Sequence, residues 1–551
     1  MIIFTENRHG FMVSKKMKTR YRSDIFRHLD GIVTAPTAYC LKQKGVLDYI
    51  LQNSPKTTAA LAKEFQANEG YLNVALRTLA SQGWLSYQVD NNKNEVTIAK
   101  NDKSAIAFAH CDWYELAVAY LNIEEKFGAD SLEIKKFSLF QKSFEAYKNG
   151  VYTLSENAEE RSIQEQIIKH IEGVLVGPVT VFLAMNGFFH NYFMEASFRP
   201  EEFHRDPQNF GKILDFFCFL GWFTQKNDTY SFTDKGLFYA KRASAYGVTV
   251  SYIPTLRKVT HLLFGDYMSL RDHTSKAPEV HVDRVMNVWG SGGAHTTYFK
   301  KIDEIIIEVF NRPIDQQPKG ILDMGCGNGA FLIHLFDVID KQTLRGKYLE
   351  DYPLFLVGAD YNKEALKVTR ANLINADIWA KVLWADIGDP VQLDTDIFEN
   401  YNIRLGELLN VRTFLDHNRI WDNTIKTPAD KDSSSTGAFV SKGKRLSNNL
   451  VEESLKQHIN TWKPYIKTYG LILIELHTLA PELTAKNIGK TAATAYDTTH
   501  GFSDQYILEL GVFLNVLKET GLTSQSNHFS KFPDNDLATV SIHYITETNH
   551  A

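Results

Sequence analysis

A glycine-rich turn in the second half of the chain has the residue types and spacing of a ligand-binding site. Residues 320–335 read GILDMGCGNGAFLIHL: an apolar strand ends in Asp323, and Gly325, Gly327 and Gly329 follow before an apolar helix. Glycine lets a turn pass close to a ligand where a side chain would clash. In a dinucleotide-binding turn the last glycine stands three residues after the second. Here it stands two residues after, and the acid before the turn would repel a phosphate but attract an ammonium group.

Two further strand candidates also end in acids. The strand at 354–360 ends in Asp360, whose two carboxylate oxygens can accept hydrogen bonds from both hydroxyls of a ribose. The strand at 381–385 is followed by Asp386. The residues expected to contact the ligand are Asp323, Gly325, Gly327, Gly329, Asp360, Tyr361, Asp386 and Ile387.

This D-x-G-x-G-x-G pattern resembles motif I of the class I S-adenosylmethionine (SAM) methyltransferases. The resemblance implies SAM as the cofactor, with Asp360 on its ribose and Asp386 near its adenine. A nicotinamide-dependent dehydrogenase is the main alternative, and the glycine spacing disfavours it. Strand candidates at 408–414, 471–476 and 538–545 complete an α/β alternation. We therefore expect a Rossmann-like domain with a mostly parallel sheet and the ligand at the carboxyl ends of its strands.

Three other stretches, at 290–299, 410–419 and 499–506, resemble the C-methyltransferase domains of polyketide synthases, in particular those of apratoxin-type loading modules. This resemblance covers roughly residues 285–548. It implies methylation of a malonyl-type acyl substrate, free or carrier-bound, through an enolate stabilised by one Fe(II) or Mn(II). By the same resemblance His500 and Gln505, five residues apart, would hold the metal, and Tyr298 would lie in the segment that covers SAM.

The residues alone leave other roles open for these side chains. His500 could be a general base in a metal-free O- or N-methyltransferase, and so could His417, which follows a strand near the transferred methyl group. Glu475 and His477 end the next strand, and the alternation of side chains does not decide which of them points toward the ligand. A polar, serine-rich segment at 426–449 is expected to be a mobile surface loop.

The front half contains one helical unit twice. Pro36 and Pro178 are each followed nine residues later by a glycine and two apolar residues. Further on, Gly83-Trp84 and Gly221-Trp222 each end a periodic helix and precede two strand-like stretches. Three helices and a two-stranded wing form a winged-helix pattern, which small-molecule O-methyltransferases also carry before their catalytic domain. The predicted domains are two winged-helix-like units (1–100 and 176–275), a helical insert (101–175) and the catalytic domain (276–551).

Charge and composition limit the partners. The third helices, 69–82 and 207–220, each carry one acid and one base, and the whole 551-residue chain has a net charge of −5. DNA binding, as in a SAM-sensing regulator, needs several basic side chains and is therefore not expected. We expect no membrane span and no signal sequence, and four cysteines without C-x-x-C spacing suggest the cytoplasm. A homodimer through the front half and an acyl carrier protein are the expected protein partners.

Overall fold

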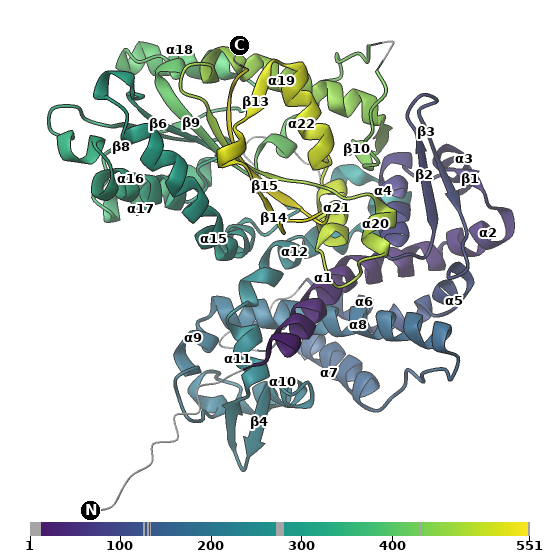
Figure 1. Ribbon diagram of the computed structural model, residues 1–551. Coiled ribbons are helices and arrows are strands. Elements are labelled where there is room, and N and C mark those ends of the chain that lie inside the picture. The colour runs from purple at the N-terminus through teal and green to yellow at the C-terminus, as the bar shows by residue number, and fades with distance from the viewer. Residues whose placement is uncertain are drawn as a thin grey trace, which may run out of the picture.

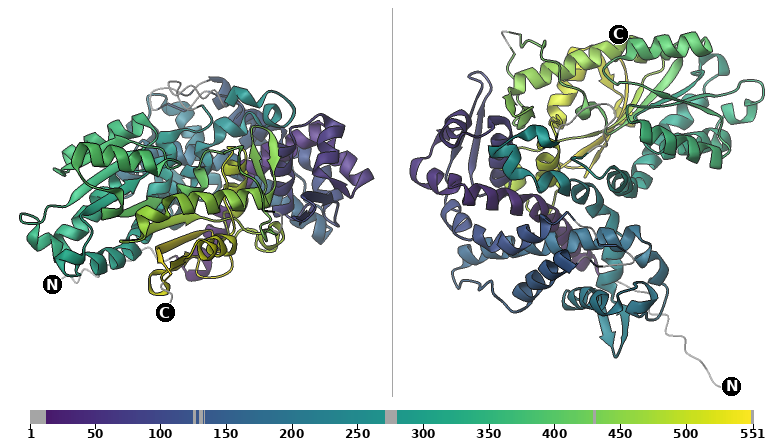
Figure 2. Two further views of the ribbon diagram at one scale, coloured as in Figure 1. Left: turned by 90° about the horizontal axis from the view of Figure 1, so that it is seen from above. Right: turned by 180° about the vertical axis from the view of Figure 1, so that it is seen from behind.

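The computed structural model describes residues 13–124, 127–128, 132, 134–270, 280–428 and 431–548. Two bodies lie side by side: a helix-covered sheet formed by the second half of the chain, and an α-rich region formed by the first half (Figures 1 and 2). Each body has its own apolar clusters, and helices of the first half also pack against the second.

The sheet of the second half has the strand order β13-β15-β12-β9-β6-β7-β8, with β14 paired to β15. The five strands from β12 to β8 are parallel. At one edge β15 runs antiparallel to β12, and β13 beyond it is antiparallel to β15 and so has the direction of the five parallel strands. The order in which strands are added reverses between β6 and β9: β7 and β8 extend the sheet on one side and β9 and β12 on the other, so the ligand crevice is expected at the carboxyl ends of β6 and β9. The Rossmann-like class predicted from the sequence is confirmed. The strands are β6 (Gly320–Met324), β7 (Phe355–Asp360), β8 (Ala380–Trp384), β9 (Leu408–Thr413), β12 (Leu471–Leu476), β13 (Leu522–Ser524), β14 (Ser530–Phe532) and β15 (Val540–Glu547).

Helices cover both faces of this sheet, and one long helix leads into it (Figure 1). Buried Leu and Ile side chains of the strands meet the apolar faces of these helices, as the binary pattern of the sequence requires. The α-helices of the second half are α15 (Arg284–Phe310), α16 (Ala330–Gln342), α17 (Lys363–Asn375), α18 (Pro390–Tyr401), α19 (Asn448–Ile466), α20 (Pro481–Ala485), α21 (Ala493–Gly501) and α22 (Leu510–Glu519).

The front half repeats one order of elements, and the repeat extends beyond the two wings. In the first unit the order is α1 (Lys15–Gln43), α2 (Val46–Asn53), β1 (Lys56–Thr57), α3 (Thr58–Phe65), α4 (Glu69–Ser81), β2 (Ser86–Asp90), β3 (Glu95–Ala99), α5 (Ser104–Ala109), η1 (Cys111–Tyr114) and α6 (Glu115–Leu121). In the second it is α8 (Ala158–Met185), α9 (Phe188–Tyr192), η2 (Pro200–Glu202), α10 (Pro207–Phe219), β4 (Phe223–Lys226), β5 (Thr229–Phe232), α11 (Asp234–Ala240), η3 (Ala243–Tyr246) and α12 (Gly247–Ser251). Helix α7 (Ile134–Lys148) connects the units, and α13 (Ile253–Leu256) and α14 (Val259–Phe264) follow the second.

The long helices α1 and α8 cross at equivalent residues of the two units. A Cβ atom on Gly31 would lie 2.2 Å from Cα of His170, and one on Gly173 would lie 2.4 Å from Cα of His28. Each histidine also shares a hydrogen bond with a tyrosine from the 3-10 helix of the opposite unit. His28 of α1 contacts Tyr246 of η3, and His170 of α8 contacts Tyr114 of η1, both at 2.7 Å. The two units therefore meet face to face around a local two-fold relationship.

Helix α8 is long and apolar enough to cross a membrane, whereas no membrane-spanning segment is expected from the sequence. Within the described residues it is the only such helix, and 78% of its most apolar window is buried inside the protein. Its apolar surface is thus accounted for by packing against α1 and its neighbours.

The third helices of the two units are covered differently. Helix α4 packs against α20, α21 and the hairpin of β10 (Phe439–Ser441) and β11 (Lys444–Leu446), all in the second half of the chain. Helix α10 is covered by α7, where the rings of Phe144 and Phe216 pack edge to face with centroids 5.0 Å apart. All residues of α4 from Gly70 to Ser81 are buried, so this helix is not presented to a DNA groove.

Candidate active site

The carboxylate of Asp323 is buried at the end of β6 without a hydrogen-bond partner among the described residues. Burial, with a smaller contribution from the charge of Asp360, raises its pKa to about 8. A buried carboxylate without a partner is costly, so this position is suited to a ligand that brings a positive charge. The ammonium group of SAM provides that charge, and the orphaned carboxylate therefore fits the cofactor implied by the sequence.

The glycine turn beside Asp323 is held open by backbone geometry. Gly325, Gly327 and Gly329 have φ values of +80°, +56° and +78°, in the left-handed region that glycine tolerates. A Cβ on Gly327 would meet nothing within 4 Å, so the turn faces open space at this point. Asp360 at the end of β7 accepts a hydrogen bond from the Gly327 N–H at 2.9 Å and thereby ties the turn to the next strand.

The other residues expected to bind SAM lie along the same edge of the sheet. Asp386 follows β8 and accepts from the Gly388 N–H at 2.8 Å, while Ile387 beside it is buried. Tyr361 is about half exposed, and its ring lies 5.3 Å from that of Trp384. Tyr298 of α15 packs between Phe414 and Phe532, with ring centroids 6.2 and 5.1 Å away. Their contacts with SAM remain predictions, although all four lie on elements that border the crevice.

His417 and His500, predicted separately as catalytic candidates, come together in the structure. His417 follows β9 in η8 (Asp416–Asn418), and its ring centroid lies 5.3 Å from that of His500 in α21. The Nδ1–H of His417 donates to Glu475 Oε1 at 2.6 Å, and the Nδ1–H of His500 donates to the carbonyl oxygen of Tyr496 at 2.8 Å. Because Nδ1 donates in both rings, the neutral form of each ring has its lone pair on Nε2. Burial lowers the pKa of His500 to about 3, with a further contribution from His417, so this imidazole is neutral at physiological pH.

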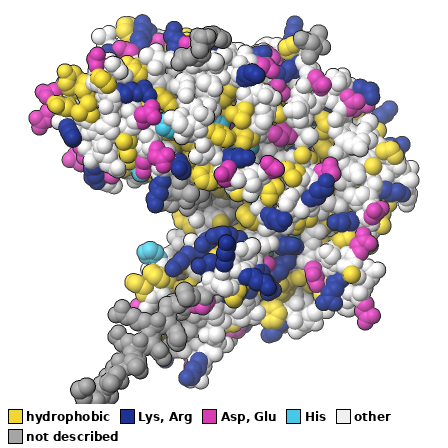
Figure 3. All heavy atoms as spheres, viewed as in Figure 1, with side chains coloured by type: hydrophobic (Ala, Val, Ile, Leu, Met, Phe, Trp, Pro, Cys, Tyr) yellow, Lys and Arg dark blue, Asp and Glu magenta, His cyan; other side chains and the backbone are white. Residues whose placement is uncertain are grey.

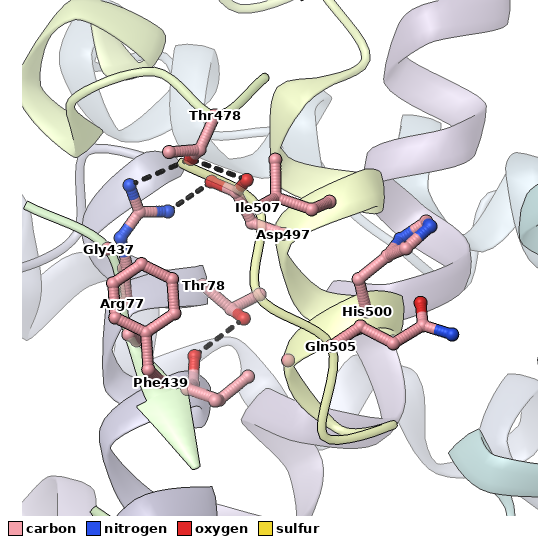
Figure 4. A pocket seen from close by; sticks show the side chains of 12 residues that line it. Arg77, Thr78, Gly437, Phe439, Thr478, Asp497, His500, Gln505 and Ile507 are labelled. Atoms are coloured by element: carbon pink, nitrogen blue, oxygen red, sulfur yellow. Dashed lines mark hydrogen bonds and ion pairs between the residues drawn. The ribbon is translucent and has the colours of Figure 1, made fainter. Parts of the chain in front are cut away.

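Gln505 lies beside His500, as its spacing in the sequence suggested. Its Nε2 donates to Asn418 Oδ1 at 3.1 Å, and its Oε1 accepts from the hydroxyl of Tyr252 at 3.4 Å. Figure 4 shows the side chains of His500 and Gln505 extending in the same direction. No group of three or more His, Cys, Asp or Glu side chains with the geometry of a metal site occurs in the described parts of the chain. A metal here would thus depend on the His500 imidazole and the Gln505 amide oxygen.

A narrow pocket reaches this site between α4 and α21. Val74, Arg77 and Thr78 of the first unit line it together with Asp497 and His500 (Figure 4). The buried Arg77 guanidinium pairs with the Asp497 carboxylate and donates to Thr478 Oγ1 at 3.1 Å and to the Leu479 carbonyl at 2.7 Å. Arg77 could not be predicted at the site from the sequence, in which it is the one basic residue of a helix with no net charge.

Of the two residues at the end of β12, Glu475 contacts His417, whereas His477 shares a 2.5 Å hydrogen bond with Ser541 Oγ. Tyr252, just after α12, also contacts the site through Gln505, and nothing in its local sequence predicts this.

The segment 426–449 is not a loose surface loop where it is described: Ser433 and Ser435 are buried, and β10 and β11 pack on α4. A polar segment can be buried here because asparagines of α19 form hydrogen bonds with its backbone groups, as in the 2.7 Å bond from Ser433 N–H to Asn449 Oδ1.

The fold and the glycine-acid site define a class I SAM-dependent methyltransferase. Three family models match the chain in succession: an AprA N-terminal domain at 21–87, an AprA winged helix domain at 172–266 and an AprA MT2-like domain at 279–543. The chain belongs to the AprA-type methyltransferases and is an S-adenosylmethionine-dependent enzyme. The domain boundaries predicted above remain predictions.

Solved structures similar to this chain include other methyltransferases. The mitomycin 7-O-methyltransferase MmcR is 12% identical, with 70% of this chain and 99% of that chain covered and a TM-score of 0.38. The CurJ carbon methyltransferase is also 12% identical, with 74% and 98% covered and a TM-score of 0.31. An O-methyltransferase family protein from Burkholderia thailandensis is 9% identical, with 67% and 94% covered and a TM-score of 0.38. No curated protein matches the chain.

Proposed function

We propose that the protein methylates a carbon atom of a small malonyl-type acyl substrate of secondary metabolism. The observation that carries this proposal is the convergence of His417, His500 and Gln505 beside the SAM crevice. In the proposed reaction the carbon between the two carbonyl groups gives up a proton to His417 Nε2 and attacks the methyl carbon of SAM. The bond from that methyl carbon to sulfur breaks, leaving the C-methylated acyl compound and S-adenosylhomocysteine.

The donor set at this position fits one Fe(II) or Mn(II). The Nδ1–H bond of His500 to the Tyr496 carbonyl is the kind of outer contact that fixes a ligating histidine, and mixed nitrogen and oxygen donors suit these metals. His500 Nε2 and Gln505 Oε1 would hold the ion, with the substrate or water as its other ligands. When bound, it would supply a Lewis acid for the carbonyl oxygens of the acyl group.

The protein's own groups have separate tasks in this scheme. Asp323 neutralises the ammonium end of SAM and so fixes the methyl group relative to the acceptor. The buried walls formed by α4 and α21 keep water away from the reacting carbon. Glu475 orients His417 and would stabilise it if it accepted the proton.

The test is to measure metal content and SAM binding on the same preparations. Native protein, His500→Ala and Gln505→Ala would be loaded anaerobically with Fe(II) or Mn(II), desalted, and examined by elemental analysis and by calorimetry with SAM. We expect about one metal ion per native chain and a large loss of bound metal in both variants. The SAM affinity of both variants should stay within about twofold of the native value. Malonyl-coenzyme A and a malonyl pantetheine thioester would then be assayed for methyl incorporation by mass spectrometry.

A metal-free methyltransferase with a histidine base is the second candidate, and the 2.6 Å bond from His417 to Glu475 favours it. If loaded native protein holds no metal, the metal-dependent scheme is wrong. Phenol, carboxylate and amine acceptors would then be assayed instead. A base role predicts that His417→Ala abolishes transfer while His500→Ala retains part of it.

A carrier-bound substrate is supported by charge. The first two turns of α1 expose five basic side chains (Lys15, Lys16, Lys18, Arg20 and Arg22) in a protein of net charge −5. Figure 3 shows Lys and Arg side chains gathered beside the notch between the two bodies. An acidic acyl carrier protein would complement such a surface. We expect malonyl-carrier protein to have a lower KM than malonyl-coenzyme A, and an advantage that disappears when Lys15, Lys16 and Lys18 are changed to Glu.

A further inference from the structure

Helix α4 of the first unit contacts α21 along its whole length through polar side chains. Gln82, just after α4, donates to Thr494 at 3.0 Å, Thr78 and Thr498 share a hydroxyl hydrogen bond at 2.7 Å, and Arg77 pairs with Asp497. Beyond the end of α21, the Tyr71 hydroxyl donates to Asp504 at 2.8 Å. A Cβ on Gly501 would lie 2.9 Å from the methyl groups of Val74, so the two backbones are also close.

These contacts occupy one side of α21, and the candidate chemistry occupies another. Asp497 and Thr498 come three and four residues after Thr494, and Gly501 comes four and three residues after them, so the four residues share a helix face. His500 points away from the Arg77–Asp497 pair toward His417, and Gln505 follows immediately after the helix (Figure 4). Whatever fixes the first face of α21 also fixes where His500 and Gln505 lie.

We propose that Arg77 and Thr78 are positioning residues for His500 and Gln505, so that the first unit is an integral part of the active site. This inference rests on the proposed function. Arg77 is fully buried, and its guanidinium joins α4 to Asp497 in α21 and to Thr478 and Leu479 after β12. Arg77 thus connects α4, α21 and the segment after β12, which lie far apart in the sequence and meet around the pocket.

The second unit provides a matched control. Asp215 stands seven residues before Trp222, as Arg77 stands seven residues before Trp84. Its carboxylate accepts from Tyr230 within the same unit at 2.9 Å, and the helix that carries it is covered by α7 rather than by the catalytic half. A change at Asp215 should therefore disturb a winged-helix-like unit without moving α21.

The experiment compares native protein with Thr78→Val, Arg77→Lys and Asp215→Ala. Thr78→Val keeps the shape of the side chain and removes one hydrogen bond, so it should fold even if Arg77→Lys does not. Hydrogen–deuterium exchange would be followed in peptides covering 493–505 and 320–335, together with SAM affinity, and kcat and KM would be measured with the malonyl thioester.

We expect Thr78→Val and Arg77→Lys to speed exchange in 493–505 at least threefold and to lower kcat about tenfold. Exchange in 320–335 and SAM affinity should stay within twofold, and Asp215→Ala should match native protein in every measurement. Native exchange in 493–505 in both variants, or equal loss of SAM affinity and kcat, would overturn the proposal. If the malonyl thioester is not a substrate, the exchange result still decides whether α4 positions α21, so that failure is separable from failure of the proposed function.

Discussion

The Nδ1 atom of His417 lies 2.6 Å from Oε1 of Glu475, which joins the segment after β9 to the end of the neighbouring strand β12. Both side chains are buried, and Glu475 also accepts from the backbone N–H of His417 at 3.3 Å. This pair fixes the ring orientation of the histidine that borders the proposed acceptor site.

Replacing Glu475 with Gln should lower methyl transfer by about 10- to 100-fold, the usual effect of removing a carboxylate that orients a functional histidine. The amide can still occupy the space but cannot stabilise a protonated ring. Single-turnover rates measure the effect on the chemical step. SAM affinity, measured by calorimetry, should stay native, and a parallel loss of SAM binding would show that Glu475 acts on the fold instead.

Asp323→Asn should weaken SAM binding by about 10- to 100-fold, because a hydrogen bond to a charged group contributes about 1.5–3 kcal/mol. The variant keeps the size of the side chain and removes the charge that the ammonium group would meet. Calorimetry checks this. Binding as tight as in native protein would mean that the ammonium group lies elsewhere.

The raised pKa of Asp323 also predicts a pH dependence. In the ligand-free protein the carboxyl is mostly protonated below about pH 8, whereas the SAM complex needs it ionised. Binding therefore releases a proton, and affinity should rise as the pH increases from 6 to 8 and then level off. The proton count follows from calorimetry in buffers of different ionisation enthalpy, and Asp323→Asn should remove this release.

Gly31→Ala should destabilise the front half by about 3 kcal/mol or more, because its Cβ would lie 2.2 Å from the backbone of His170 and only a shift of α1 against α8 could relieve the clash. Urea unfolding measures the free energy. Gly511→Ala is the matched control: this helical glycine has nothing within 4 Å of a Cβ, so the change should be neutral or stabilising by up to about 1 kcal/mol. Equal effects at the two positions would contradict the close crossing.

Local sequence was sufficient for the SAM side of the site but not for the acceptor side. The glycine turn, Asp323 and Asp360 lie within one strand–turn–helix–strand unit, so their spacing largely determines their geometry. The pairing of His417 with Glu475, and of Arg77 with Asp497, depends on how distant segments pack, and alternation along β12 could not separate Glu475 from His477. The repeat in the front half was visible because each copy keeps its Pro, Gly and Trp landmarks. The segments that cover α4 and α10 could not be predicted in this way, because they do not belong to the repeat.

The packing of α21 on α4 affects how the chain folds during its synthesis. The first unit is complete at α6, yet α21, which covers α4, leaves the ribosome about 370 residues later. At about 5–20 residues per second, the nascent chain spends roughly 20–75 s with the apolar surface of α4 and the charge of Arg77 without their final partners. The second unit has no such delay, because α7 is already made when α10 emerges. Of the two units, the first is therefore the one more exposed to misassembly and chaperone capture during translation, because α4 is covered only once the catalytic half has been made.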